Sequence, residues 1–125
     1  EGITKEDLEP YADILAQVSF AFLRTGFEKY RTENPLIYQN EGPYIATSAG
    51  KYLSDNYPNL KGVGIDFLAL GSRIPDTENP KNYYQAILGY HSGRFTTVIE
   101  DMHFSERPKG ASLSNLSMCH YALSG

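Results

Sequence analysis

Polar residues follow three of the apolar runs in this sequence, and they are the first candidates for chemistry. They are Arg24-Thr25-Gly26, Asp66 and Glu100-Asp101. Ligands in open α/β sheets bind outside the carboxyl ends of the strands, so parallel neighbouring strands would bring these groups to one edge. The alternative is structural, with Arg24 paired to a carboxylate and the acids capping the helices that follow. The residues alone leave both interpretations open.

The three histidines are separated along the chain. None of His91, His103 and His120 has the close spacing that places two imidazoles on one metal ion. His103 lies three residues after Glu100, so both could approach one ion if that stretch were helical; the alternative is an exposed turn. We expect His91 to lie in a solvated loop and His120 to be packed within a strand.

Apolar runs and apolar residues at helical spacing predict the elements that must position these groups. The predicted strands are residues 18–23, 61–67, 95–99 and 116–123. The other predicted elements are a short turn at 4–8, helices at 10–16, 43–56 and 81–90, and loops at 32–43 and 71–80. Strands that alternate with helices are typical of an α/β fold. We therefore expect one domain, residues 1–125, with a mixed sheet and flanking helices.

Composition and charge argue against several classes of protein. The chain has 125 residues, of which 41% are hydrophobic and 21% charged, as is usual for a globular domain. The net charge of -4 and the lack of a basic patch argue against nucleic acid as a partner. No apolar stretch approaches the roughly 20 residues that span a bilayer. The single cysteine, Cys119, argues against a cysteine-cluster metal site and is compatible with a cytoplasmic location.

The order of several segments carries further information. ITKEDLEP leads into FAFLRTGFEKYR, followed by GPYIATSAGKYLSDNYP and GVGIDFLALGS, and then by YYQAILGY and TTVIEDMHFSE. This succession, from Ile3 to about Glu106, resembles the central and C-terminal part of the cyclase family, which includes kynurenine formamidase and isatin hydrolase. The resemblance implies an α/β fold of the swivelling β/β/α type.

The resemblance also implies an activity, namely metal-dependent hydrolysis of a C–N amide or lactam bond in a small-molecule substrate. The family uses a metal-bound water, commonly on zinc or manganese, and a histidine as general acid and base. Glu100 matches the family's metal-binding glutamate at a strand end. Tyr84 stands where the family has a histidine ligand, and a neutral phenol is a poorer zinc ligand than imidazole. His91 could replace that ligand through a local shift.

The family's main metal motif, His-x-Gly-Thr-His-x-Asp, does not occur in these residues. The resemblance therefore leads us to expect a domain truncated at both ends, inactive by itself and prone to homo-oligomerisation. Two alternatives remain open. One is a cyclase-like scaffold that binds or assembles without catalysis, and the other is an unrelated small α/β ligand-binding domain.

Overall fold

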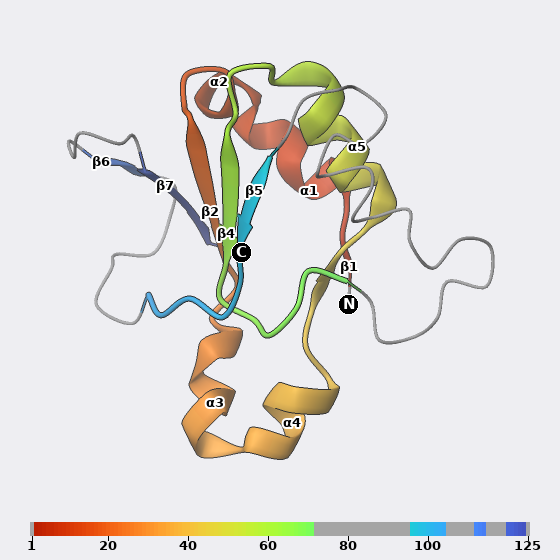
Figure 1. Ribbon diagram of the computed structural model, residues 1–125, viewed down its shortest axis with the longest axis vertical. Coiled ribbons are helices and arrows are strands. Elements are labelled where there is room, and N and C mark those ends of the chain that lie inside the picture. The colour runs from red at the N-terminus through yellow and green to blue at the C-terminus, as the bar shows by residue number, and fades with distance from the viewer. Residues whose placement is uncertain (1, 72–95, 105–111, 115–119, 125) are drawn as a thin grey trace.

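A computed structural model of the chain describes residues 2–71, 96–104, 112–114 and 120–124 (Figure 1). The helical elements are α1 (Lys5–Leu8), η1 (Glu9–Tyr11), α2 (Ala12–Leu15), η2 (Phe27–Lys29), α3 (Tyr30–Glu33), α4 (Pro35–Asn40) and α5 (Thr47–Asn56). The strands are β1 (Gly2–Ile3), β2 (Phe20–Arg24), β3 (Tyr44–Ile45), β4 (Gly62–Ile65), β5 (Thr97–Ile99), β6 (Ser112–Ser114) and β7 (His120–Ser124).

The main sheet has five described strands in the order β5-β4-β2-β7-β6. The β2, β4, β5 and β7 strands run parallel, whereas β6 is antiparallel to β7. A second, two-stranded sheet pairs β1 with β3 in parallel. The expected α/β class and the mixed sheet are therefore confirmed.

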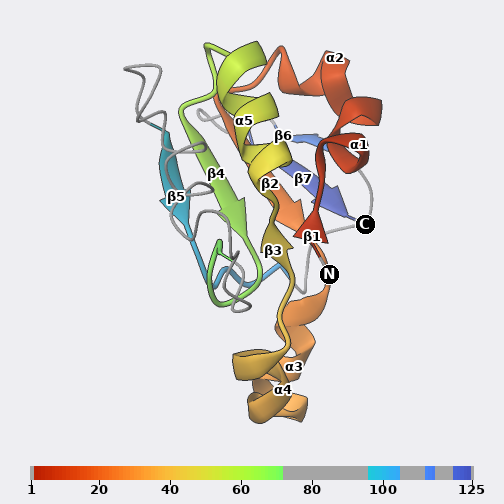
Figure 2. The same cartoon turned by 90° about the vertical axis from the view of Figure 1, so that its right-hand side faces the viewer.

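One face of the main sheet is covered by helices. Figures 1 and 2 show α1, α5 and the β1–β3 pair together on this face. The sheet contributes Ala21, Leu23, Val63 and Ile65 to the core, and the covering segments contribute Leu8, Leu15, Ile45, Ala49 and Leu53. The four residues contributed by the sheet occupy alternate positions of β2 and β4, so each strand directs every second side chain towards the helices.

The opposite face of β2 and β4 carries aromatic rings packed against glycines. A Cβ atom added to Gly64 would overlap the Phe22 ring, and one added to Gly62 would overlap the Phe20 ring. Phe104 packs on Phe22, with ring centroids 5.8 Å apart. All four residues of β4 are buried, as expected for a strand covered on both faces. The two glycines of the GVG segment thus make room for phenylalanine rings.

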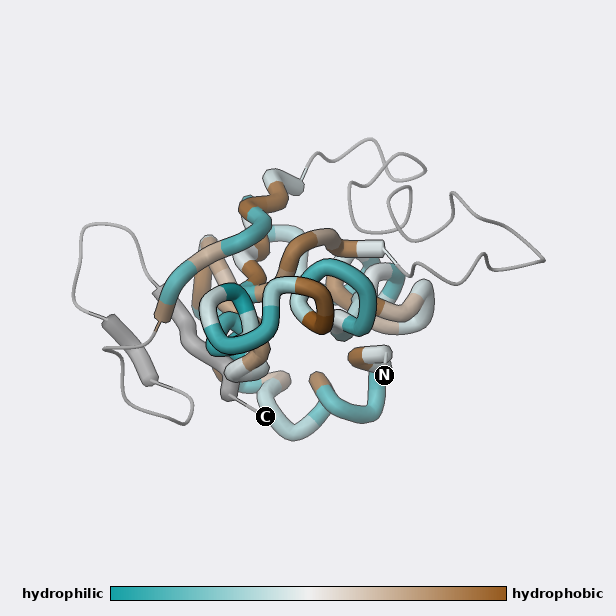
Figure 3. Tube along the Cα trace, turned by 90° about the horizontal axis from the view of Figure 1, so that it is seen from below, coloured by the Kyte–Doolittle hydropathy of each residue, from teal (hydrophilic) through white to brown (hydrophobic). Residues whose placement is uncertain are grey.

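The predicted loop at 32–43 was wrong, because this segment contains most of the α3–α4 pair. The side chain of Asn34 accepts a hydrogen bond from the Ile37 amide at 3.3 Å, and Pro35 occupies the first turn of α4. Both are helix-starting features, although Asn and Pro also favour loops. Figure 1 shows the pair extending beyond the sheet, and Figure 3, seen from that end, shows a short hydrophobic stretch in a largely hydrophilic pair.

The boundaries of other predicted elements differ less from those in the structure. The predicted helix at 43–56 begins at Thr47, because Tyr44 and Ile45 pair with β1 instead. The predicted strand at 116–123 overlaps β7, and its residues 116–119 lie outside the described residues. The predicted helix at 81–90, and the loop at 71–80 beyond residue 71, lie outside the described residues.

We predict that Gly64→Ala lowers the free energy of unfolding by about 1–3 kcal/mol, because the new methyl group overlaps the Phe22 ring and the Met102 sulfur. Chemical denaturation followed by circular dichroism measures this change. Gly42→Ala is the matched control, since its added Cβ meets nothing closer than 3.5 Å. Equal effects of the two substitutions would contradict the packing described for β4.

Candidate functional site

The ends of three parallel strands meet at one edge of the main sheet. Leu23 of β2 pairs with Ile65 of β4, and Gly64 of β4 pairs with Ile99 of β5. The residues that follow these strands therefore lie at the same edge. The predicted convergence of Arg24-Thr25-Gly26, Asp66 and Glu100-Asp101 is confirmed.

The carboxylate of Asp66 is fully buried and binds the turn that follows β2. It accepts hydrogen bonds from the Thr25 amide at 2.9 Å, the Thr25 hydroxyl at 2.7 Å and the Gly26 amide at 2.7 Å. Gly26 has a φ angle of 79°, a conformation that favours glycine. A buried charge needs such partners, so these contacts account for the burial of Asp66. Asp66 links β4 to the end of β2.

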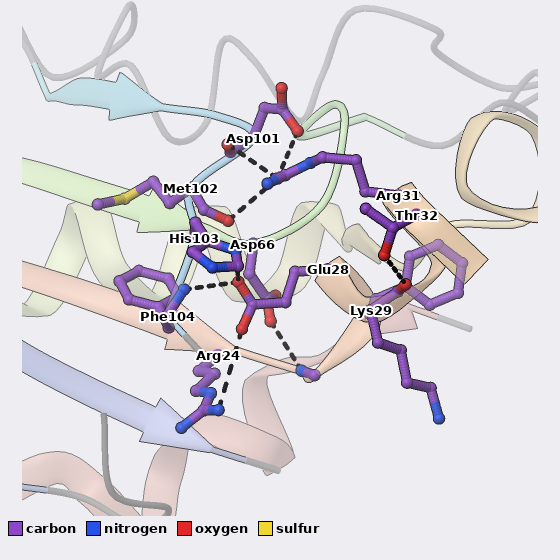
Figure 4. Close-up of polar contacts among 12 residues, drawn as sticks. Arg24, Glu28, Lys29, Arg31, Thr32, Asp66, Asp101, Met102, His103 and Phe104 are labelled. Carbon is purple, nitrogen blue, oxygen red and sulfur yellow. Dashed lines mark hydrogen bonds and ion pairs between the residues drawn. The ribbon is translucent and has the colours of Figure 1, made fainter. Parts of the chain in front are cut away.

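A second buried carboxylate, Glu28, was not among the sequence candidates. Its Oε2 atom lies 2.5 Å from the Phe104 amide and 3.1 Å from His103 Nδ1, and its Oε1 atom lies 3.9 Å from Arg24 Nη2 (Figure 4). Glu28 thus joins the end of β2 to the segment that follows β5. The four-residue spacing from Arg24 was the only signal in the sequence, and it does not distinguish this glutamate from others.

A third polar group connects the α3–α4 pair to the same segment. Arg31 Nη2 lies 2.6 Å from Asp101 Oδ1 and 3.0 Å from the Asp101 carbonyl oxygen. The Tyr38 hydroxyl donates a hydrogen bond to the same carboxylate oxygen. Burial, reinforced by this bond, raises the pKa of Tyr38. Asp101 has a φ of 59°, which is unusual for a residue other than glycine, and these contacts hold it there.

Glu100, the candidate metal ligand, is exposed and accepts a hydrogen bond from the Leu70 amide at 2.8 Å. Among the described residues, no group of three His, Cys, Asp or Glu side chains could hold a metal ion. The described residues therefore do not provide the donor set that zinc or manganese needs, and further ligands to an ion at Glu100 would have to come from other parts of the protein.

The structural alternative for the strand-end residues is partly confirmed. Arg24 is buried and lies near a carboxylate, that of Glu28, as this alternative requires. The Asp66 carboxylate does not cap a following helix among the described residues, because it binds the turn after a neighbouring strand. His103 is exposed, with 66% of its side chain accessible, and contacts Glu28.

The remaining sequence candidates can be placed only in part. His120 is the first residue of β7, in agreement with the strand expected there. Tyr84, His91 and Cys119 lie outside the described residues.

The chain is similar to a protein of a known bacterium. An uncharacterized protein of Haemophilus influenzae is 96% identical over 67 residues, which are 54% of this chain and 47% of that protein. The chain thus spans about half the length of this relative. No protein-family model and no solved structure matches the chain. Within the described parts of the chain, no helix is long and apolar enough to cross a membrane.

We predict that Asp66→Asn lowers the free energy of unfolding by about 2–4 kcal/mol, because an amide group replaces one acceptor oxygen with a donor that faces backbone N–H groups. Urea denaturation measures the difference. Asp55→Asn, on an exposed residue of α5, is the control and should change stability by less than about 0.5 kcal/mol. An effect of Asp66→Asn as small as that of the control would show that the buried contacts contribute little.

Proposed function

We propose that this chain is part of a metal-dependent hydrolase of the cyclase type, which acts on a C–N amide or lactam bond. The observation that supports the proposal best is the position of Glu100, directly after β5 at the edge where β2 and β4 also end. Ligands of open α/β sheets bind at this kind of edge. The order of segments supports the same family. Glu100 contributes one carboxylate ligand to zinc or manganese.

The same proposal includes properties of the whole protein. Its substrate is a small molecule with an amide or lactam group, and its location is cytoplasmic. The parent domain is of the swivelling β/β/α type, extends beyond both ends of this chain, and forms a homo-oligomer. The remaining metal ligands belong to parts of the protein outside the described residues.

The alternative proposal is a non-catalytic binding or assembly scaffold. One observation favours it: three acids at this edge, Asp66, Glu28 and Asp101, bind backbone amides or the side chains of a neighbouring arginine and tyrosine. Acids used in this way stabilise the fold whether or not the protein catalyses a reaction. The two proposals differ over Glu100, because only the hydrolase requires this residue to bind an ion.

Binding of Mn²⁺ to the chain tests this difference, because the ion broadens the NMR signals of nearby nuclei even when binding is weak. We expect substoichiometric Mn²⁺ to broaden the amide signals of Leu70 and Glu100 first. Glu100→Gln should weaken this binding about tenfold or more, since it removes the charge of a carboxylate ligand. The glutamine oxygen can still accept from Leu70, so the local fold is retained.

Glu6→Gln, on an exposed glutamate of α1, serves as the matched control and should leave the broadening unchanged. Equal broadening in wild type and Glu100→Gln would exclude Glu100 as a ligand. That result would favour the scaffold.

A further inference from the structure

The α3–α4 pair contacts the carboxyl edge of the sheet at Asp101, the residue directly after Glu100. Arg31 Nη2 lies 2.6 Å from Asp101 Oδ1, and it donates to the carbonyl oxygens of Asp101 at 3.0 Å and Met102 at 3.2 Å. The Tyr38 hydroxyl donates to the same carboxylate oxygen and accepts from Arg31 Nη2 at 3.1 Å. Figure 4 shows the Arg31 side chain extending from the helical pair to the segment after β5. The helical pair thus holds both the side chain and the backbone of Asp101.

These contacts hold Asp101 in an uncommon backbone conformation. Its φ of 59° lies in the left-handed region, which residues other than glycine rarely adopt, although aspartate and asparagine tolerate it. The Tyr38 side chain is buried and stacks on Phe27, with ring centroids 5.9 Å apart, so its hydroxyl has a fixed position. The Arg31 guanidinium lies over the Tyr38 ring, 5.2 Å from its centroid. Arg31 and Tyr38, here called the clamp, therefore fix the conformation of Asp101.

The φ angle of Asp101 determines where Glu100 lies. The chain that follows this angle is anchored, because the Met102 amide donates to the Ile65 carbonyl oxygen at 2.9 Å and the Phe104 amide binds a buried carboxylate. A change in φ would therefore rotate the chain that precedes it, which carries Glu100.

Glu100 has a neighbour whose position would reveal such a rotation. Its Oε1 atom accepts a hydrogen bond from the Leu70 amide at 2.8 Å. Leu70 is buried, and its carbonyl oxygen accepts from the Ile45 amide at 2.9 Å, so the Leu70 amide has a fixed position. The Asp101 amide donates to the Phe67 carbonyl oxygen at 3.0 Å. A rotation about φ of Asp101 would displace both bonds and move the Glu100 carboxylate away from Leu70.

We propose that Arg31 and Tyr38 are positioning residues for Glu100, and that they act by holding Asp101 in its left-handed conformation. The clamp thereby fixes the Glu100 carboxylate beside the Leu70 amide, at the edge where ligands of open α/β sheets bind. The α3–α4 pair thus belongs to the candidate site. The binding of an ion by Glu100 rests on the proposed function, whereas the position of its carboxylate does not.

The Leu70 amide proton reports the position of Glu100 in NMR spectra of the chain, with no metal present. Glu100→Ala gives the reference signal, because it removes the acceptor of this hydrogen bond. We expect Asp101→Ala to move the Leu70 signal most of the way to that reference, since alanine cannot bind the clamp and disfavours a positive φ. Asp101→Asn should leave the signal near its wild-type position, because asparagine keeps an acceptor oxygen and tolerates this conformation.

Tyr38→Phe tests the clamp without any change at residues 100 and 101, and it should move the Leu70 signal in the same direction as Asp101→Ala. Tyr30→Phe is the matched control, because it removes a hydroxyl of α3 that is not part of the clamp, and it should leave the signal unchanged. Unchanged amide signals of β2 and β4 show that each variant keeps the fold.

A Leu70 signal that stays at its wild-type position in both Asp101→Ala and Tyr38→Phe would overturn the proposal. Equal shifts in Asp101→Asn and Asp101→Ala would also overturn it, because asparagine can still bind the clamp. The Mn²⁺ experiment on the wild type is independent of this readout. A lack of Mn²⁺ broadening around Glu100, together with a Leu70 signal that moves as expected in the variants, would overturn only the proposed metal-dependent function.

Discussion

The carboxylate of Asp66 is the interaction on which the carboxyl edge of the sheet depends. It is fully buried and accepts hydrogen bonds from two consecutive amides, those of Thr25 and Gly26, and from the Thr25 hydroxyl. These bonds join the ends of β2 and β4 and set the direction in which the chain leaves β2. Glu28 follows two residues later, so its reach to the Phe104 amide depends on the same turn. The segment that carries His103 is in this way connected to Asp66 through Glu28.

Two groups of polar side chains can be distinguished at this edge. Asp66 and Glu28 are buried and bind backbone amides, and such groups stabilise the fold because removing one leaves buried donors without a partner. Glu100 and His103 lie on the exposed side of the same edge, and each also contacts a fixed neighbour. A rigid frame that holds accessible polar side chains is the arrangement that ligand binding requires. The proposed function assigns metal binding to Glu100 on this basis.

Sequence patterns predicted the elements whose identity depends on burial. The runs around Phe22, Val63 and Val98 form parallel strands. The first two are largely buried, as expected for continuous apolar segments covered on both faces, whereas the strand around Val98 is partly exposed. Sequence patterns could not predict α3 and α4, since asparagine and proline, here Asn34 and Pro35, are common in loops as well as at helix starts. Glu28 was also missed, because its burial depends on the Phe104 amide, 76 residues away in the chain. Contacts of this range follow from tertiary packing and leave no local pattern.

Amide hydrogen exchange measured by NMR tests most directly whether the contacts of Asp66 and Glu28 form a rigid frame. The Thr25 and Gly26 amides bind Asp66, and the Phe104 amide binds Glu28, so all three should exchange as slowly as the β4 amides, through global unfolding. The Thr4 amide provides the comparison, because it also binds a carboxylate, that of Asp7 at 2.8 Å, but at the exposed start of α1, where exchange should be fast. Exchange of Thr25, Gly26 and Phe104 as fast as that of Thr4 would contradict a buried frame at the carboxyl edge.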